Sequence, residues 1–438
     1  MLRTARPRWI RLSALVALVA LSFACAATNL PPISAMGGAF TPLPDELALW
    51  EESRAEEAKL LDNVRLYDDP ELEMYLERIV DGLDSPGMAA NQEVRYEVRV
   101  VADPTLNAFA YPHGSFYVHT GLLARVENEA QLATVLGHEM THVDGRHMLR
   151  HRRAAQNREI GFAIASVAAA VIIAEQVDDL YWDGHWGEAA TVEILANVIA
   201  GLGLQLAFVA AVNGYGRELE READAGGLTR LGLAGYDAGE APKLYEALLD
   251  DHGEPPAKVE AFFFGSHPNL EDRIERTEEA LRVRGAVPPG SRGLGDQAEF
   301  DLRMRTVARD DARLNLELGR LELAGNELAR ARRELPGDAE TQFLLGMLSR
   351  GRAAVAKDGT ARESHLADAA EAFTQALGLD PRHAEAHREL GLLAYDRGER
   401  LSACRHLRAA LEVDPELPGV EKVDEILVEL EADGACPP

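Results

Sequence analysis

The segment His138-Glu139-Met140-Thr141-His142 constrains the fold of this chain more than any other feature. On a helix, residues four apart share a face, so the two imidazoles converge on one metal ion and Glu139 is turned toward the adjacent open position. Imidazole suits zinc, and a site with three protein ligands leaves one position for water. The pattern predicts a zinc-binding helix and requires a third ligand from another part of the chain.

The residues before this motif argue against the alternative, a surface helix that carries two incidental histidines. Residues 131–136 are mainly apolar with helical spacing, and Gly137 follows them, where a close-packed neighbouring helix would fit. A buried approach of this kind favours a metal-binding helix in the interior of the protein.

The position of the next histidine decides whether the third ligand follows directly, as in metzincins, which carry a histidine six residues after the second one. Gly145 fits that pattern, but residue 148 is Met and His147 comes one position early. We therefore reject that class. Because His147 points away from the face that His138 and His142 share, we expect it to pack beside the helix or to hydrogen-bond a ligand from behind.

An acidic segment downstream offers a carboxylate ligand instead. Glu220 and Asp224 are four residues apart and face one way on a helix. We predict Glu220 as the third zinc ligand and Asp224 as the acceptor that fixes the outer N–H of a ligating histidine. Glu218 with Glu222 is the competing register.

The N-terminus has the layout of a secretory signal peptide. Four arginines precede an uncharged run from Leu12 to Phe23, which is too short to span a bilayer comfortably, and small residues follow it. We expect residues 1–24 to be a signal peptide. The triplet Ala24-Cys25-Ala26 permits ordinary cleavage, but Cys25 also stands where a bacterial lipoprotein carries its lipid. The chain is therefore expected in the periplasm, either free or anchored to the outer membrane through Cys25.

Composition narrows the classes of function and the number of domains. The 438 residues, 47% apolar and 27% charged, are enough for about three folded domains. The net charge of −28 repels phosphate backbones, which excludes a general nucleic-acid-binding protein. We expect a Pro- and Gly-rich linker over residues 25–44, a zinc metallopeptidase domain over 45–290 and a repeat domain over 296–434.

Local patterns predict a mainly α fold with a small β-sheet. Helical spacing runs from Leu47 to Ile79, alternation from Val94 to Val100 predicts a strand, and Ser115–His119 is a second extended stretch. The apolar stretches 160–174 and 194–212 are interpreted as buried or membrane-leaning helices. A membrane span over 194–212 is the alternative, although it would place the two halves of the metal site on opposite membrane faces.

The C-terminal third repeats with a period of 34 residues. Leu379-Asp380-Pro381 recurs as Val413-Asp414-Pro415, and an earlier copy with Leu345-Gly346 is offset by a further 11-residue insertion placed near residues 357–364. This period predicts tetratricopeptide helix pairs stacked into an α-solenoid. The stack is either a groove for peptides and partner proteins or only a spacer. Cys404 and Cys436 permit one disulfide in an oxidising compartment, or are two separate thiols.

Four separated blocks resemble, in order, those of the HtpX-like zinc peptidases of the gluzincin type. The blocks are Asn107-Ala108-Phe109-Ala110 with Gly114, Phe116 and Val118; His138-Glu139-x-x-His142 with His147; Glu220-x-x-x-Asp224; and His267-Pro268 with Arg273. The resemblance covers roughly residues 45–285 and supports the Glu220 register. One departure is Pro112-His113-Gly114, where the family has Pro-Gly-Gly.

The resemblance implies a zincin-type endopeptidase with one zinc ion, in which Glu139 takes the proton from water and delivers it to the leaving nitrogen. It also implies that the block with Asn107, Gly114, Phe116 and Val118 leads into the active-site edge strand, and we expect the strand Ser115–His119 to pair with an extended substrate. His267 is interpreted as a removable fourth metal ligand, and the alternative is a structural loop histidine held by Pro268. The expected substrates are misassembled outer-membrane proteins, with the repeats docking on clients or on assembly machinery. The alternative is a periplasmic chaperone or adaptor whose peptidase core is largely silent.

Overall fold

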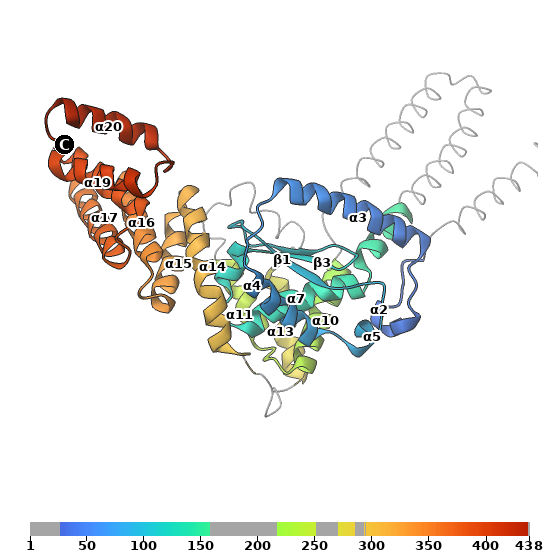
Figure 1. Cartoon of the computed structure of the whole chain (residues 1–438). Coiled ribbons are helices and arrows are strands. Elements are labelled where there is room, and N and C mark those ends of the chain that lie inside the picture. The colour runs from blue at the N-terminus through green and yellow to red at the C-terminus, as the bar shows by residue number, and fades with distance from the viewer. Residues whose placement is uncertain (1–26, 158–216, 251–269, 285–292, 294, 437–438) are drawn as a thin grey trace, which may run out of the picture.

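The computed structural model describes residues 27–157, 217–250, 270–284, 293 and 295–436 (Figure 1). The expected signal peptide with Cys25, the apolar stretches 160–174 and 194–212, and His267 lie outside these ranges. Within them, no helix has both the length and the hydropathy that a membrane span requires.

A small sheet organises the N-terminal half. Its strands are β1 (Glu97–Val101), β2 (Ala108–Ala110) and β3 (Ser115–His119), in the order β1-β3-β2. β3 pairs with β1 in parallel and with β2 in antiparallel register. The expectation that Ser115–His119 lies at the active-site edge is therefore wrong, because within the described residues β3 is the central strand of the sheet, and β1 and β2 flank it.

Helices cover both faces of this sheet. The side chains of Phe116 and Val118 face the main apolar core, together with α4 (Pro70–Leu83) and α7 (Glu129–Asp144). Tyr117 faces the other way, and its hydroxyl donates a hydrogen bond to Glu57 of α3 (Pro44–Asn63) at 2.7 Å. Helix α3 thus lies across the face opposite α7, as Figure 1 shows. The short helix α5 (Pro86–Ala89) follows α4 and precedes β1 in the chain, and α6 (Thr120–Arg125) follows β3 and precedes α7.

The segment expected to be a linker is partly folded. Residues Ile33–Met36 form the short helix α2 and Gly37–Ala39 a 3-10 turn, η1. Ile33 and Phe40 are 1% and 5% exposed and belong to the main core. Ser34 donates two hydrogen bonds of 2.8 Å, from its backbone N–H and its hydroxyl, to Asp144 at the end of α7. Two apolar anchors and one buried carboxylate order a segment whose Pro and Gly content indicated a linker.

The C-terminal region is a stack of helix pairs, as the repeat period predicted. Its helices are α14 (Gln297–Glu317), α15 (Leu321–Glu334), α16 (Ala339–Val355), α17 (Gly359–Leu379), α18 (Ala384–Asp396), α19 (Arg400–Val413) and α20 (Val420–Ala432). α14 pairs with α15, α16 with α17, and α18 with α19. The inserted residues lengthen the middle pair, since α16 and α17 have 17 and 21 residues where α18 and α19 have 13 and 14. A disulfide joins Cys404 of α19 to Cys436.

Helix α14 belongs to both regions. Phe300, Met304 and Val307, in its first half, pack into the main core, whereas Ala312 packs with the repeat helices. Buried polar contacts reinforce this junction, where Thr120 of α6 donates to Asp311 at 2.7 Å and Arg125 pairs with Glu327 at 2.7 Å. The repeats are therefore built onto the N-terminal core and not suspended from a free linker.

Candidate metal centre

The metal centre lies where α7 crosses α10 (Arg217–Ala234). The two helices approach closely because glycines face each other at the crossing. A Cβ atom on Gly227 would lie 3.2 Å from the backbone nitrogen of His138, and one on Gly226 would lie 2.4 Å from Thr141 Cγ2. Gly137, expected to admit a neighbouring helix, lies against Gly227 and Leu231. This close crossing brings the first turn of α10 beside the two histidines.

The three predicted ligands converge at this crossing. His138 Nε2 lies 3.0 Å from His142 Nε2, and the two Glu220 carboxylate oxygens lie 3.5 and 3.4 Å from these nitrogens. All three side chains are buried. Donor atoms in a tetrahedral zinc site with bonds of 2.0–2.1 Å are roughly 3.3 Å apart. Two imidazoles and one carboxylate at these distances fit zinc.

Burial also decides between the two registers of the acidic helix. Glu220 is 5% exposed and faces the histidines, whereas the Glu222 side chain is 43% exposed and pairs with Arg150 at 2.8 Å. The register with Glu220 inward is therefore the one that the fold adopts.

Each ligating histidine is held from behind by a different partner. Because Nε2 of each ring faces the other ligands, Nδ1 carries the hydrogen and donates it outward. His138 Nδ1 lies 2.9 Å from Asp224 Oδ1, and His142 Nδ1 lies 2.9 Å from His147 Nδ1. Burial lowers the pKa of His147 to about 4, so its ring is neutral and accepts this hydrogen bond.

The charges around His138 favour a proton on its ring in the absence of metal. Burial and the nearby Arg273 cation lower the pKa of His138, but the carboxylates of Asp224 and Glu220 outweigh them and raise it to about 9. Burial would raise the pKa of Asp224, yet Arg273 and His138 hold it below its usual range. Metal binding at this centre must therefore release a proton from His138.

Glu139 and the edge of the sheet lie next to the ligands. Glu139 is 3% exposed on α7, between the two histidines, and β2 contacts α7. Asn107 precedes β2 directly and is buried. Phe116 and Val118, which the sequence assigned to the substrate strand, are each 1% exposed and pack in the core. Gly114 forms the turn into β3 at a φ of 108°.

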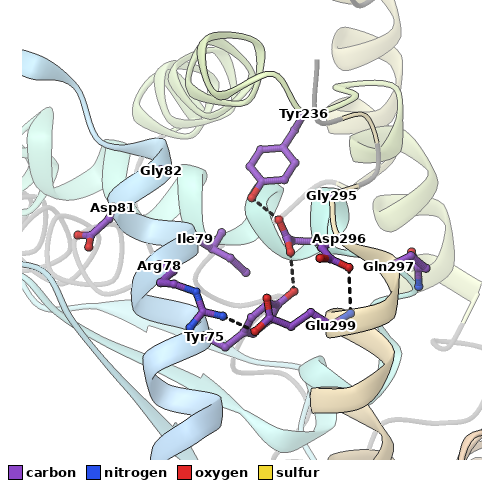
Figure 2. A pocket seen from close by; sticks show the side chains of 11 residues that line it. Tyr75, Arg78, Ile79, Asp81, Gly82, Tyr236, Gly295, Asp296, Gln297 and Glu299 are labelled. Atoms are coloured by element: carbon purple, nitrogen blue, oxygen red, sulfur yellow. Dashed lines mark hydrogen bonds and ion pairs between the residues drawn. The ribbon is translucent and has the colours of Figure 1, made fainter. Parts of the chain in front are cut away.

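A cavity of about 800 Å³ lies at the other end of α7, between α4 and α14 (Figure 2). Glu129 lines it and accepts hydrogen bonds from the hydroxyls of Tyr75 and Tyr236 at 2.9 and 2.6 Å. Glu129 precedes His138 by nine residues, which is about 13 Å along a helix. This polar cavity is therefore separate from the metal ligands.

A family model described as Peptidase family M48 matches residues 67–281. These residues form an M48 peptidase domain. The match begins just before α4 and ends in α13 (Leu270–Arg284), so it includes every metal ligand named above. Helix α3 and the helix pairs from α14 onward lie outside the matched M48 residues.

Curated relatives match the M48 domain and part of its surroundings. A Vibrio cholerae protein named putative beta-barrel assembly-enhancing protease is 29% identical over 287 residues, covering 64% of this chain and 52% of that protein. The Escherichia coli beta-barrel assembly-enhancing protease is 26% identical, with 62% and 51% covered. The Arabidopsis thaliana mitochondrial metalloendopeptidase OMA1 is 30% identical, with 48% and 39% covered. The chain spans about half the length of these relatives, or less.

Two residues behind the metal centre were not assigned a role from the sequence. In the sequence, Arg273 belongs only to the late His267-Pro268 block and Tyr245 belongs to no motif, yet both lie against Asp224. Only the packing of α11 (Glu240–Asp250) and α13 on the M48 core brings them there.

Proposed function

We propose that this chain is a zinc-dependent endopeptidase that acts on unfolded or misassembled proteins of the cell envelope. The observation that carries the proposal is the buried convergence of His138, His142 and Glu220 with Glu139 on the same helix. A buried set of two imidazoles and two carboxylates is costly to maintain unless it binds a cation, and this one matches the ligand chemistry of catalytic zinc.

Bound zinc would supply a Lewis acid that polarises the scissile carbonyl and acidifies water. Glu139 is placed to accept the proton from the attacking water and to deliver it to the leaving amide nitrogen. Asp224 and His147 keep the outer N–H groups of the two histidines engaged, so each ring presents Nε2 to the centre. The chain thereby orients both imidazoles before any substrate binds.

The edge of the sheet suggests how substrate is presented. In the part of the chain that the structure describes, β2 pairs with β3 on one side only, and it contacts the metal-binding helix α7. An extended segment can add to such an edge through backbone hydrogen bonds, which favours unfolded clients over compact ones. We therefore transfer the substrate-pairing role from Ser115–His119 to Ala108–Ala110.

The relatives and the repeats support the cellular part of the proposal. The Vibrio cholerae relative is named a putative beta-barrel assembly-enhancing protease, and the Escherichia coli relative is named a beta-barrel assembly-enhancing protease. We propose that this chain likewise acts in the periplasm on outer-membrane proteins, and that its helix pairs bind clients or assembly machinery. Lipidation of Cys25 would anchor it at the outer membrane.

The test compares wild type with Glu139→Gln in zinc content and in hydrolysis of a reduced, unfolded protein. We expect one zinc per chain in both, and hydrolysis slower by roughly 10²–10⁴-fold in the variant, because the general base is lost. Glu127→Gln, an exposed change just before α7, is the control and should retain activity. His267→Ala should raise hydrolysis if His267 is a removable metal ligand.

The proposed peptidase activity would be contradicted if wild type, Glu139→Gln and His267→Ala had equal zinc content and equally negligible hydrolysis. Client binding that persists in all three would then favour the chaperone or adaptor. If the purified protein binds no zinc, the proposal that this chain is a zinc-dependent enzyme is wrong.

A further inference from the structure

Four helices meet at the carboxylate of Asp224. Asp224 belongs to α10, His138 to α7, Tyr245 to α11 and Arg273 to α13. Arg273 Nη2 donates to Asp224 Oδ1 at 2.7 Å, and Arg273 Nε lies 3.1 and 3.2 Å from the two carboxylate oxygens. The Tyr245 hydroxyl accepts from Arg273 at 3.0 Å and donates to Asp224 Oδ1 at 3.3 Å. We call these three residues, Asp224, Tyr245 and Arg273, the carboxylate clamp.

The clamp is buried and its charges are matched. Arg273 is 3% and Tyr245 is 4% exposed. The Arg273 guanidinium also lies over the Tyr245 ring, 4.3 Å from its centroid, which adds a cation–π contact. A guanidinium stays charged in a protein, so in this interior it needs the Asp224 carboxylate as its counter-ion.

The side from which Arg273 approaches His138 determines what it can do. Arg273 Nη2 lies 3.1 Å from His138 Nδ1, the nitrogen that points away from the other ligands. His138 Nε2, on the opposite edge of the ring, lies 3.0 Å from His142 Nε2. Arg273 is therefore behind the ligand and does not face the position of a reacting carbonyl. This placement favours a role in orienting His138 over direct stabilisation of an oxyanion.

We propose that Arg273 is a positioning residue for the metal centre that acts through Asp224, and that Tyr245 holds Arg273 in place. With Arg273 contacting both carboxylate oxygens, the Asp224 carboxylate has one orientation, and its Oδ1 is aimed at His138 Nδ1. The imidazole then has one direction for its hydrogen bond, and its Nε2 has one direction toward the metal. The clamp thereby makes zinc affinity depend on how α11 and α13 pack against α10.

The inference rests on the proposed zinc-peptidase function, but its main measurement does not require hydrolysis. Zinc affinity is measured by chelator competition on purified wild type, Arg273→Gln, Arg273→Lys and Tyr245→Phe, with circular dichroism to verify folding. We expect zinc binding about 10–100-fold weaker in Arg273→Gln, and smaller losses in the other two, because loss of an outer partner of a metal ligand costs about that much. The absorption bands of the cobalt-substituted protein should shift in Arg273→Gln.

A matched control lies one turn along the same helix. Arg276 is partly exposed and pairs with Asp272, so Arg276→Gln should leave zinc affinity and the cobalt spectrum unchanged. Dependence on Asp224 is tested in an Asp224→Asn background, where Arg273→Gln should have no further effect on zinc affinity.

Three results would overturn the inference. Unchanged zinc affinity with a lowered kcat in Arg273→Gln would place Arg273 at the substrate. Equal losses of zinc affinity with and without Asp224→Asn would show that Arg273 does not act through Asp224. A similar loss in Arg276→Gln would indicate general weakening of α13. If wild type binds zinc and the clamp variants weaken it while none hydrolyses protein, the proposed function fails and this inference stands.

Discussion

Glycines allow close packing of helices in both halves of the molecule, but they face different kinds of residues in each half. At the crossing of α7 and α10, Gly226 and Gly227 face Thr141 and the backbone nitrogen of His138, which belong to the metal-binding motif itself. In the repeats, Gly346 of α16 faces the ring of Phe373, where a Cβ would lie 2.4 Å from Cε1. Gly391 of α18 receives Leu407 in the same way. The glycines of the first crossing face residues of the metal-binding motif, whereas Gly346 and Gly391 face apolar side chains.

The effect of disturbing a glycine contact between two helices therefore depends on which residues the glycine faces. A shift of α10 against α7 moves Glu220 relative to His138 and His142, so a packing error becomes an error in ligand distances. A shift of α17 against α16 loosens an apolar contact that neighbouring residues can partly fill. We therefore expect packing changes to lower zinc affinity at the crossing of α7 and α10, and to lower the stability of the fold at the crossing of α16 and α17.

The largest effect on the metal is expected from Gly226→Ala. The new Cβ would lie 2.4 Å from Thr141 Cγ2 and 2.7 Å from its hydroxyl oxygen, so α10 must move or Thr141 must turn. We expect zinc affinity to fall roughly 10–100-fold, as for other disturbances next to a ligand. Chelator competition measures this.

The matched control is Gly232→Ala on the same helix, where a Cβ meets no atom within 4 Å. It should leave zinc affinity unchanged and stabilise α10 by up to about 1 kcal/mol, because Ala favours helix over Gly. Adding Thr141→Ala to Gly226→Ala should restore much of the zinc affinity. Weak zinc binding that persists after this second change would contradict the steric explanation.

A smaller effect, confined to stability, is expected from Gly346→Ala. The methyl group would collide with the Phe373 ring, so the pair α16–α17 must open, and overpacking of this kind costs about 1–3 kcal/mol. Thermal unfolding measures the loss, and zinc affinity should not change. Gly378→Ala in α17, which meets no atom within 4 Å, is the control and should be neutral or slightly stabilising.

Much of the metal centre could be predicted because its residues come in pairs that are only four positions apart in the sequence. The spacing of His138 and His142 fixes one face of one helix, and Glu220 with Asp224 fixes the face of another. Gly137 indicated that a helix packs nearby. The repeat glycines Gly346 and Gly391 were equally visible, because the 34-residue period aligns them once the 11-residue insertion between them is included.

What the sequence could not reveal depends on contacts between distant segments. Extended stretches indicated strands, but the order β1-β3-β2 is set by pairing across the fold, so the edge strand was misassigned. The burial of Ile33 and Phe40 depends on the core that receives them. Tyr245 reaches Asp224 only through the packing of α11, and no spacing within the sequence records that contact.

The smallest expected effect is the coupling between the two regions. Combining Gly226→Ala with Gly346→Ala should give changes in zinc affinity and in stability that add within about 0.5 kcal/mol, because the two crossings share no contact. Helix α14 is the element that could couple the two regions, because Phe300 and Met304 pack in the metallopeptidase core while Ala312 packs with α16 and its neighbours. If Gly346→Ala lowers zinc affinity in the double variant beyond the sum, α14 transmits strain from the repeats to the metal centre. The two regions would then function as one mechanical unit despite their different use of glycine.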